Sequence, residues 1–147
     1  MRGTEELDAG IWTKLRLLGR SYGNPDAMIA RRVLILEDSL IIAMEAEEIL
    51  HEIGMDTVEI ASNLEQAIVA INADSYDFAL LDVNLGEGMS FGFARMLMER
   101  GIRFGFVTGY STTQDFPADM QQVPLLVKPF DAVAMQHFVD KLFPDKI

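Results

Sequence analysis

The chain alternates short apolar runs with longer segments in which apolar residues recur every three or four positions. The runs have the length and the aliphatic or aromatic character of strands buried on both faces, and they occupy residues 32–36, 57–61, 77–82, 104–108 and 124–127. The periodic segments predict helices over 39–53, from the capping pair Ser62 and Glu65 onward, over 89–100 and over 131–142. Residues 112–120 could form one further short helix, which Pro117 weakens.

Each of the four longer helices has one apolar face. These faces comprise Ile42, Ala46, Ile49, Leu50 and Ile53; Leu64, Ala67, Ile68 and Ile71; Phe91, Ala94, Leu97 and Met98; and Met135, Phe138, Val139 and Leu142. Strands that alternate with helices in this way predict an α/β domain, in which a doubly wound parallel sheet is covered by helices on both faces.

The first thirty residues differ from the rest of the chain. They carry four basic and four acidic residues, so the whole net charge of −11 belongs to residues 31–147. Asp8 could cap a helix with a stripe of Ile11, Trp12, Leu15 and Leu18, and residues 21–25 resemble a turn or linker. We therefore divide the chain into an N-terminal extension, 1–30, and a main domain, 31–147. Met28 is an alternative natural start.

The role of the extension stays open at this point. It could pack on its own domain, form a dimer contact or act as a docking helix, and a homodimer is compatible with the sequence.

Composition narrows the classes of function. The chain has 147 residues, half of them apolar, and it has no cysteine, which excludes disulfides, thiolate-bound metals and a thiol nucleophile. With 12 basic against 23 acidic residues, binding to nucleic acid or an anionic membrane is not expected, whereas metal cations and basic partners are favoured. Neither a membrane-spanning run nor a signal peptide is visible, so we expect a cytoplasmic protein.

Ligands of doubly wound sheets bind beyond the carboxyl ends of the strands. The residues expected at these ends are Glu37, Asp38, Asp82, Thr108, Lys128 and Pro129. Crowded carboxylates are costly unless a cation joins them, and oxygen ligands suit Mg²⁺. We expect Asp38 and Asp82 to bind this metal directly, the backbone carbonyl of Asn84 to add a third ligand, and Glu37 to act through water.

The same cluster suggests phosphoryl chemistry. Lys128 would neutralise part of the charge and hold a phosphoryl oxygen, and Thr108 could donate a hydrogen bond to another. Asp82 would then be placed to attack phosphorus and form an acyl phosphate. Taken singly, each residue has an ordinary role as a turn former, helix cap or solvated charge. It is their joint placement at strand ends that favours this chemistry.

Four motifs at these strand ends resemble the receiver domains of bacterial two-component response regulators. They are VLILEDS (33–39), ALLDVNL (79–85), FVTGY (106–110) and LVKPF (126–130). The resemblance implies a flavodoxin-like (βα)5 fold with strand order 2-1-3-4-5. It also implies that Asp82 is the phosphoacceptor, Glu37 and Asp38 the acid pair, Thr108 the switch hydroxyl and Lys128 the motif lysine, with a cis bond before Pro129.

One position departs from the common receiver pattern. Many receivers carry Tyr or Phe three residues before the lysine, where this chain has Leu125. Tyr110 instead follows Thr108 and Gly109, in a string similar to that of the "FAT GUY" receivers of alphaproteobacteria, which are often stand-alone and linked to general stress signalling. We therefore take Tyr110 as the candidate for part of the aromatic switch role.

The resulting hypothesis is a stand-alone response regulator rather than an enzyme. A sensor histidine kinase or phosphotransfer protein would phosphorylate it, and an unidentified downstream protein would read it. The chain stops soon after its last helix, so no DNA-binding or enzymatic output domain is expected. The alternatives are a degenerate receiver that binds partners constitutively and, with less support because Asn84 cannot act as an acid or base, a small aspartyl-phosphate hydrolase.

Overall fold

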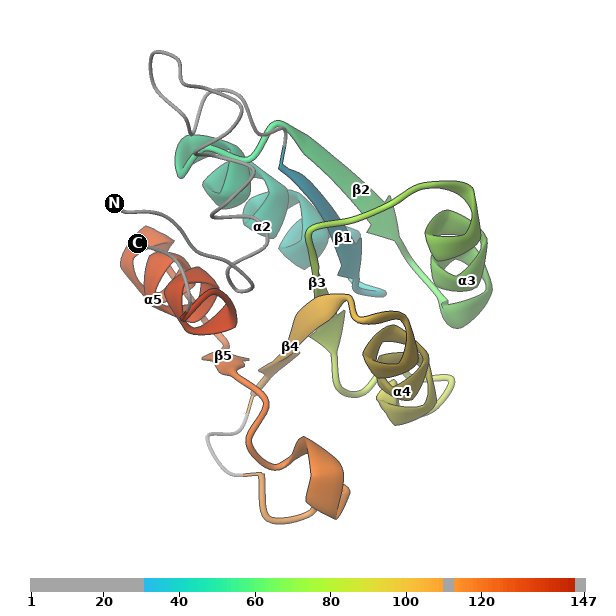
Figure 1. Ribbon diagram of the computed structural model, residues 1–147. Coiled ribbons are helices and arrows are strands. Elements are labelled where there is room, and N and C mark those ends of the chain that lie inside the picture. Colours follow the sequence, from blue (N-terminus) through green and yellow to red (C-terminus); the bar gives the residue numbers. More distant parts are fainter. Residues whose placement is uncertain (1–30, 110–112, 145–147) are drawn as a thin grey trace, which may run out of the picture.

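Five short apolar segments pair into one parallel sheet in the order β2-β1-β3-β4-β5 (Figure 1). The computed structural model describes residues 31–109 and 113–144. The strands are β1 (Arg32–Leu36), β2 (Thr57–Ala61), β3 (Phe78–Asp82), β4 (Arg103–Thr108) and β5 (Leu125–Val127). The predicted flavodoxin-like sheet and its strand order are confirmed, with β3 at the centre. The predicted N-terminal extension, including the helix after Asp8, lies outside the described residues.

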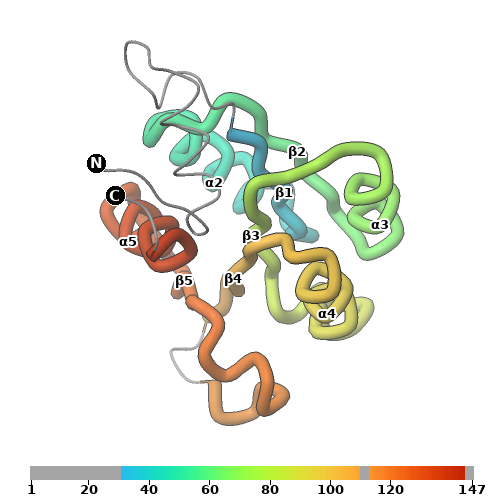
Figure 2. The backbone as a smooth tube through the Cα atoms, viewed as in Figure 1, coloured from blue at the N-terminus to red at the C-terminus, as the bar shows by residue number. Residues whose placement is uncertain are grey.

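In the part of the chain that the structure describes, four α-helices cover the two faces of this sheet. They are α2 (Leu40–Glu52), α3 (Leu64–Ala73), α4 (Phe91–Arg100) and α5 (Ala132–Leu142). Helices α2 and α5 lie on one side of the sheet and α3 and α4 on the other (Figures 1 and 2). Successive residues of each strand point to opposite faces, so the sheet supplies one wall of each of two apolar cores. Leu80 belongs to the α2–α5 core, whereas its neighbour Leu81 belongs to the α3–α4 core.

Polar side chains cap three of the helices. Ser39 and Asp131 accept hydrogen bonds from the third following backbone N–H at the starts of α2 and α5. The predicted cap of α3 was wrong by one residue, because Asn63, rather than Ser62, accepts from Gln66 N at 2.8 Å. The Ser62 N–H and hydroxyl instead both donate to the Gln66 side-chain oxygen.

The predicted inward face is confirmed in full for α5 and needs correction for α3 and α4. Ile68 on α3 and Met98 on α4 are exposed, although they lie on the predicted stripes. Helix α4 turns Phe93 inward beside Ala94 and Leu97. A short helix touches a flat sheet along a narrow strip, so a residue at the margin of the apolar stripe can remain in solvent.

The connection from β4 to β5 differs from the predicted helix over 112–120. Of its described residues, only Ala118–Met120 are helical, as a single 3₁₀ turn that follows Pro117. Proline has no N–H to donate to an α-helical ladder, so the turn starts after it. Met120 is fully buried in the α3–α4 core and holds the connection against the sheet.

None of the helices that the structure describes has the length and apolar character that crossing a membrane requires.

Candidate phosphorylation site

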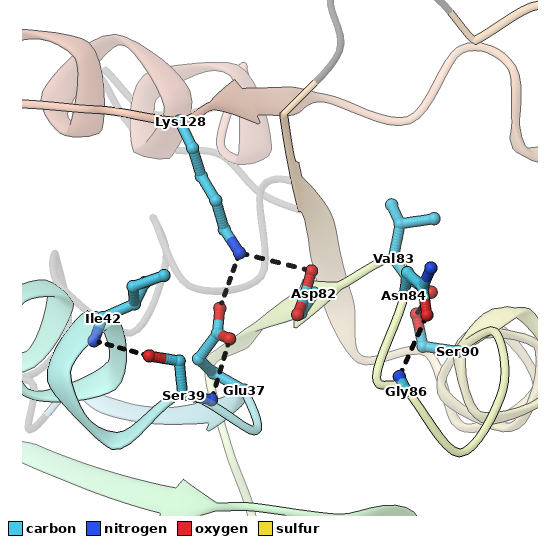
Figure 3. A network of polar contacts seen from close by, with 9 residues as sticks. All are labelled: Glu37, Ser39, Ile42, Asp82, Val83, Asn84, Gly86, Ser90 and Lys128. Carbon is cyan, nitrogen blue, oxygen red and sulfur yellow. Dashed lines mark hydrogen bonds and ion pairs between the residues drawn. The ribbon is translucent and has the colours of Figure 1, made fainter.

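The carboxyl ends of four strands bring the predicted residues to one edge of the sheet. Figure 3 shows Glu37, Asp82 and Lys128 at this edge. Glu37 and Asp38 follow β1, Asp82 ends β3, Thr108 ends β4, and Lys128 follows β5. The strands are in register there: Leu36 pairs with Leu81, Asp82 with Val107, and Thr108 with Val127. Parallel pairing therefore places residues that are far apart in sequence within one pocket.

A lysine joins two buried carboxylates in this pocket. The Lys128 ammonium lies 3.2 Å from Glu37 Oε1 and 3.5 Å from Asp82 Oδ1. Glu37 and Asp82 are only 3% and 6% exposed, so each needs a partner for its charge. The second Glu37 oxygen accepts a hydrogen bond from Ser39 N at 3.1 Å, which fixes the carboxylate across the end of β1.

The environment of Asp82 favours its protonated form. The pKa of Asp82 is raised to about 7, first by burial and then by the neighbouring Glu37 charge, by a hydrogen bond with Glu37 and by the Asp38 charge. Lys128 opposes this rise. One ammonium thus compensates the crowded carboxylates only in part, and the pocket can take up more positive charge.

The acidic residues form a donor set that suits a divalent cation. One carboxylate oxygen from each of Glu37, Asp38 and Asp82 lies within 4.8 Å of the others. Asp38 is exposed, whereas the other two are buried, so the cluster opens to solvent on the Asp38 side. Oxygen-only ligands, few in number and open to water, fit Mg²⁺.

The loop from β3 to α4 is held by hydrogen bonds among its own residues. Asn84 Oδ1 accepts from Gly86 N at 2.9 Å, Leu85 N donates to Gly88 O, and Ser90 N donates to Val83 O. The Asn84 side chain is thus engaged within the loop. The oxygen of Asn84 that we predict as a metal ligand is its backbone carbonyl.

Gly86 lets the loop approach the acidic cluster. Its φ of 82° is in the region that favours glycine, and a β-carbon at this position would lie 3.5 Å from Asp38 Oδ2.

The pocket has a volume of about 670 Å³ and an apolar wall that the sequence analysis missed. This wall comprises Ile42, Val83, Met89, Phe91 and Phe116. The Phe116 ring lies edge-on to Phe91 and Phe106, with centroids 5.1 and 5.2 Å apart. An aromatic residue just before Pro117, in a connection rich in polar residues, was the sequence signal for this contact.

The predicted switch residues fall in different places. Thr108 is buried, and its carbonyl accepts a hydrogen bond from Lys128 N at 2.8 Å. Leu125 is half-buried and packs against the α3–α4 core. Tyr110 lies outside the described residues. The peptide bond between Lys128 and Pro129 is cis, as the resemblance implied.

The fold and this pocket agree with a comparison against protein families. Residues 33–140 match the response regulator receiver domain, so the chain belongs to that family and to two-component signalling. Receiver domains are phosphoacceptors rather than classical enzymes, bind Mg²⁺ at an acidic pocket, and interact with histidine kinases or phosphotransfer proteins and with downstream partners.

Two curated relatives share part of the chain. It is 24% identical to the sensory transduction protein LytR of Staphylococcus haemolyticus over 114 residues, which is 76% of this chain and 44% of LytR. It is 42% identical to histidine kinase 5 of Arabidopsis thaliana over 52 residues, which is 35% of this chain and 6% of the kinase. The chain thus spans less than half the length of these curated relatives.

Solved structures extend the similarity. SdrG from Sphingomonas melonis Fr1 is 31% identical with a TM-score of 0.68, over 77% of this chain and 96% of SdrG. The PhyR stress response regulator is 26% identical with a TM-score of 0.67, over 82% of this chain and 48% of PhyR. The chemotaxis response regulator CheY4 of Vibrio cholerae is 19% identical with a TM-score of 0.68, over 78% of this chain and 99% of CheY4. At this identity, the likeness shows the fold alone.

Proposed function

We propose that this protein is a phosphorylation switch, which accepts a phosphoryl group on Asp82 from a sensor histidine kinase or a phosphotransfer protein. The observation that carries the proposal is the position of the Lys128 ammonium, which contacts both Glu37 and Asp82 at the carboxyl edge of the sheet. A cation beside a buried carboxylate in a solvent-open pocket favours the attack of that carboxylate on a dianionic phosphoryl group.

In the proposed reaction, a carboxylate oxygen of Asp82 attacks the phosphorus of a phosphohistidine. A P–O bond forms to give the acyl phosphate, the P–N bond breaks, and the departing imidazole nitrogen takes up a proton. Lys128 can hold one phosphoryl oxygen, and the Thr108 hydroxyl can donate to another. Glu37 holds Lys128 in place through their 3.2 Å contact.

Asp38, Asp82 and the backbone carbonyl of Asn84 would hold Mg²⁺, with Glu37 acting through water. When bound, this ion supplies positive charge that offsets the crowded carboxylates and the transferring group. Asp38 is suited to this role because it is the exposed member of the acidic cluster and thus the one open to a hydrated ion.

The output that we propose is a change in protein contacts. Phosphorylation would draw Thr108 toward the phosphoryl group and shift the surface formed by β4, β5 and α5, with Tyr110 and Leu125 as the accompanying switch residues. We also propose that the protein acts as a cytoplasmic regulator. Its likeness to the PhyR stress response regulator supports a role in stress signalling.

Intact-mass measurement after incubation with acetyl phosphate tests this proposal. We expect the wild type to gain one phosphate in Mg²⁺ and none in excess chelator. Asp82→Asn should gain none under either condition. Asp77→Asn is the matched control, because Asp77 precedes the amino end of the same strand, where its carboxylate accepts from Arg32 N, and this variant should be phosphorylated like the wild type.

Two results would contradict the proposal. Phosphate on Asp82→Asn at the wild-type level would remove the assignment of the acceptor. A wild type that takes phosphate neither from acetyl phosphate nor from a phosphorylated histidine phosphotransfer protein would point to a constitutive binding module. Continuous release of many equivalents of inorganic phosphate per protein from acetyl phosphate, without accumulation of the phosphorylated protein, would instead point to a hydrolase.

A further inference from the structure

The outward face of α2 carries an exposed apolar patch. Leu40, Ile41 and Met44 are 64%, 81% and 54% exposed, while the opposite face of the helix packs on the sheet. These three residues, here called the α2 patch, begin directly after the Ser39 cap. Since Ser39 also lines the phosphorylation pocket, the α2 patch adjoins the pocket. Clustered exposed apolar side chains indicate a contact surface.

The same face becomes acidic toward the end of the helix. A hollow of about 830 Å³ runs along it, lined among the described residues by Ile41, Met44, Glu45, Glu47, Glu48, His51 and Glu52. Ile41, Glu45, Glu48 and Glu52 follow one another at helical spacing, so apolar and acidic positions share one stripe. A matching partner would offer apolar side chains beside basic ones.

The chain itself contains such a partner before its first strand. Residues 8–20 have an apolar stripe at helical spacing, Ile11, Trp12, Leu15 and Leu18, and they also contain Lys14, Arg16 and Arg20. The segment is therefore apolar and basic, whereas the rest of the chain carries the net negative charge. Its charge complements that of the outward face of α2.

The position of the tether makes this contact accessible. The Arg31 carbonyl accepts hydrogen bonds from Asp56 N and Thr57 N, so the chain enters the described fold close to where α2 ends. A random-coil chain as long as the ten residues 21–30, which separate this segment from Arg31, has an average reach of roughly 17 Å, and the 13 residues of α2 span about 20 Å. Tethering on this scale gives an effective concentration in the millimolar range.

We propose that residues 8–20 form an amphipathic helix that docks on the α2 patch and its acidic continuation within the same molecule. Trp12 and its apolar neighbours would cover Ile41 and Met44, and the basic side chains would lie against the glutamates. The proposal does not depend on the phosphoacceptor role of Asp82.

Trp12 is the sole tryptophan of the chain, so its fluorescence reports this contact without a label. In the full-length protein we expect an emission maximum blue-shifted from that of N-acetyltryptophanamide and reduced quenching by acrylamide. Ile41→Asp should move the emission to the red and raise the quenching constant several-fold. Added salt should shift the wild type in the same direction, because the charge contacts are exposed.

Val69→Asp is the matched control. Val69 is 62% exposed and lies on α3, on the other side of the sheet, so this variant should leave Trp12 emission unchanged. Circular dichroism melts verify that both variants fold. Wild-type emission equal to that of the free fluorophore would overturn the proposal, as would emission that neither Ile41→Asp nor Met44→Asp alters. A blue shift that disappears on dilution would assign the segment to a second copy and overturn docking within one molecule.

Discussion

The carboxylate of Glu87 accepts a hydrogen bond from the backbone N–H of Leu64 at 2.9 Å. Leu64 is the first residue of α3, where backbone N–H groups lack partners within the helix. Glu87 belongs to the loop from β3 to α4, which also carries Asn84. One side chain therefore caps α3 and holds the loop beside the acidic pocket.

Replacing Glu87 should weaken both the helix and the loop. We expect Glu87→Ala to lower the free energy of unfolding by about 1 kcal/mol, as for loss of a helix cap, and to weaken Mg²⁺ binding several-fold. Glu87→Gln keeps an acceptor oxygen and should retain most of both properties. Urea unfolding and Mg²⁺ titration measure the two effects, and equal behaviour of Ala and Gln variants would refute the role of the hydrogen bond.

Lys128→Ala should separate phosphorylation from switching. The acidic pocket and the Asp82 nucleophile remain in this variant, so intact mass should still show the phosphate, formed more slowly. Without the ammonium that joins Glu37 and Asp82, the Thr108 methyl NMR signal should no longer respond to phosphorylation. Lys141→Ala, an exposed lysine on α5, is the control and should respond as the wild type does. A full Thr108 response in Lys128→Ala would contradict the prediction.

The raised pKa of Asp82 predicts how stability depends on pH in the presence of chelator. A carboxyl whose pKa is about 7 in the folded protein, against 3.8 as the reference, holds its proton more tightly when folded. Stability from this group is therefore present below pH 4 and lost as pH rises through 7. Asp82→Asn should accordingly exceed the wild type in melting temperature near pH 8, and the difference should shrink toward pH 4. Added Mg²⁺ should raise the melting temperature of the wild type more at pH 8 than at pH 4. A difference that does not vary with pH would refute the shift.

Two glycines should respond to alanine in opposite directions. At Gly105 on β4, a β-carbon would lie 2.3 Å from the Phe138 ring and 2.8 Å from the Pro124 carbonyl oxygen, so Gly105→Ala should destabilise the fold by about 1–3 kcal/mol or more. Gly92 on α4 has no atom within 4 Å of such a carbon, and Gly92→Ala should stabilise by up to about 1 kcal/mol. Urea unfolding of the two variants measures the contrast, and similar changes of either sign would show that the Phe138 contact does not constrain β4.

The sequence by itself was enough to predict the strands, their order in the sheet, and the positions of Glu37, Asp82 and Lys128 at the carboxyl edge. Short apolar runs and helical periodicity are local patterns, and parallel connections restrict how the runs can pair. The family motifs then assigned the order of the sheet, which periodicity alone leaves open.

Tertiary structure decided the contacts that join segments with no local relation. The sequence does not show that Phe116 forms a wall of the pocket with Phe91, that Glu87 caps a helix 23 residues earlier, or that Ile68 stays in solvent. The sequence does not show the raised pKa of Asp82 either, because burial and the distances to Glu37 and Lys128 set it. Periodicity reports which side chains are apolar, whereas packing and charge compensation depend on which of them meet in three dimensions.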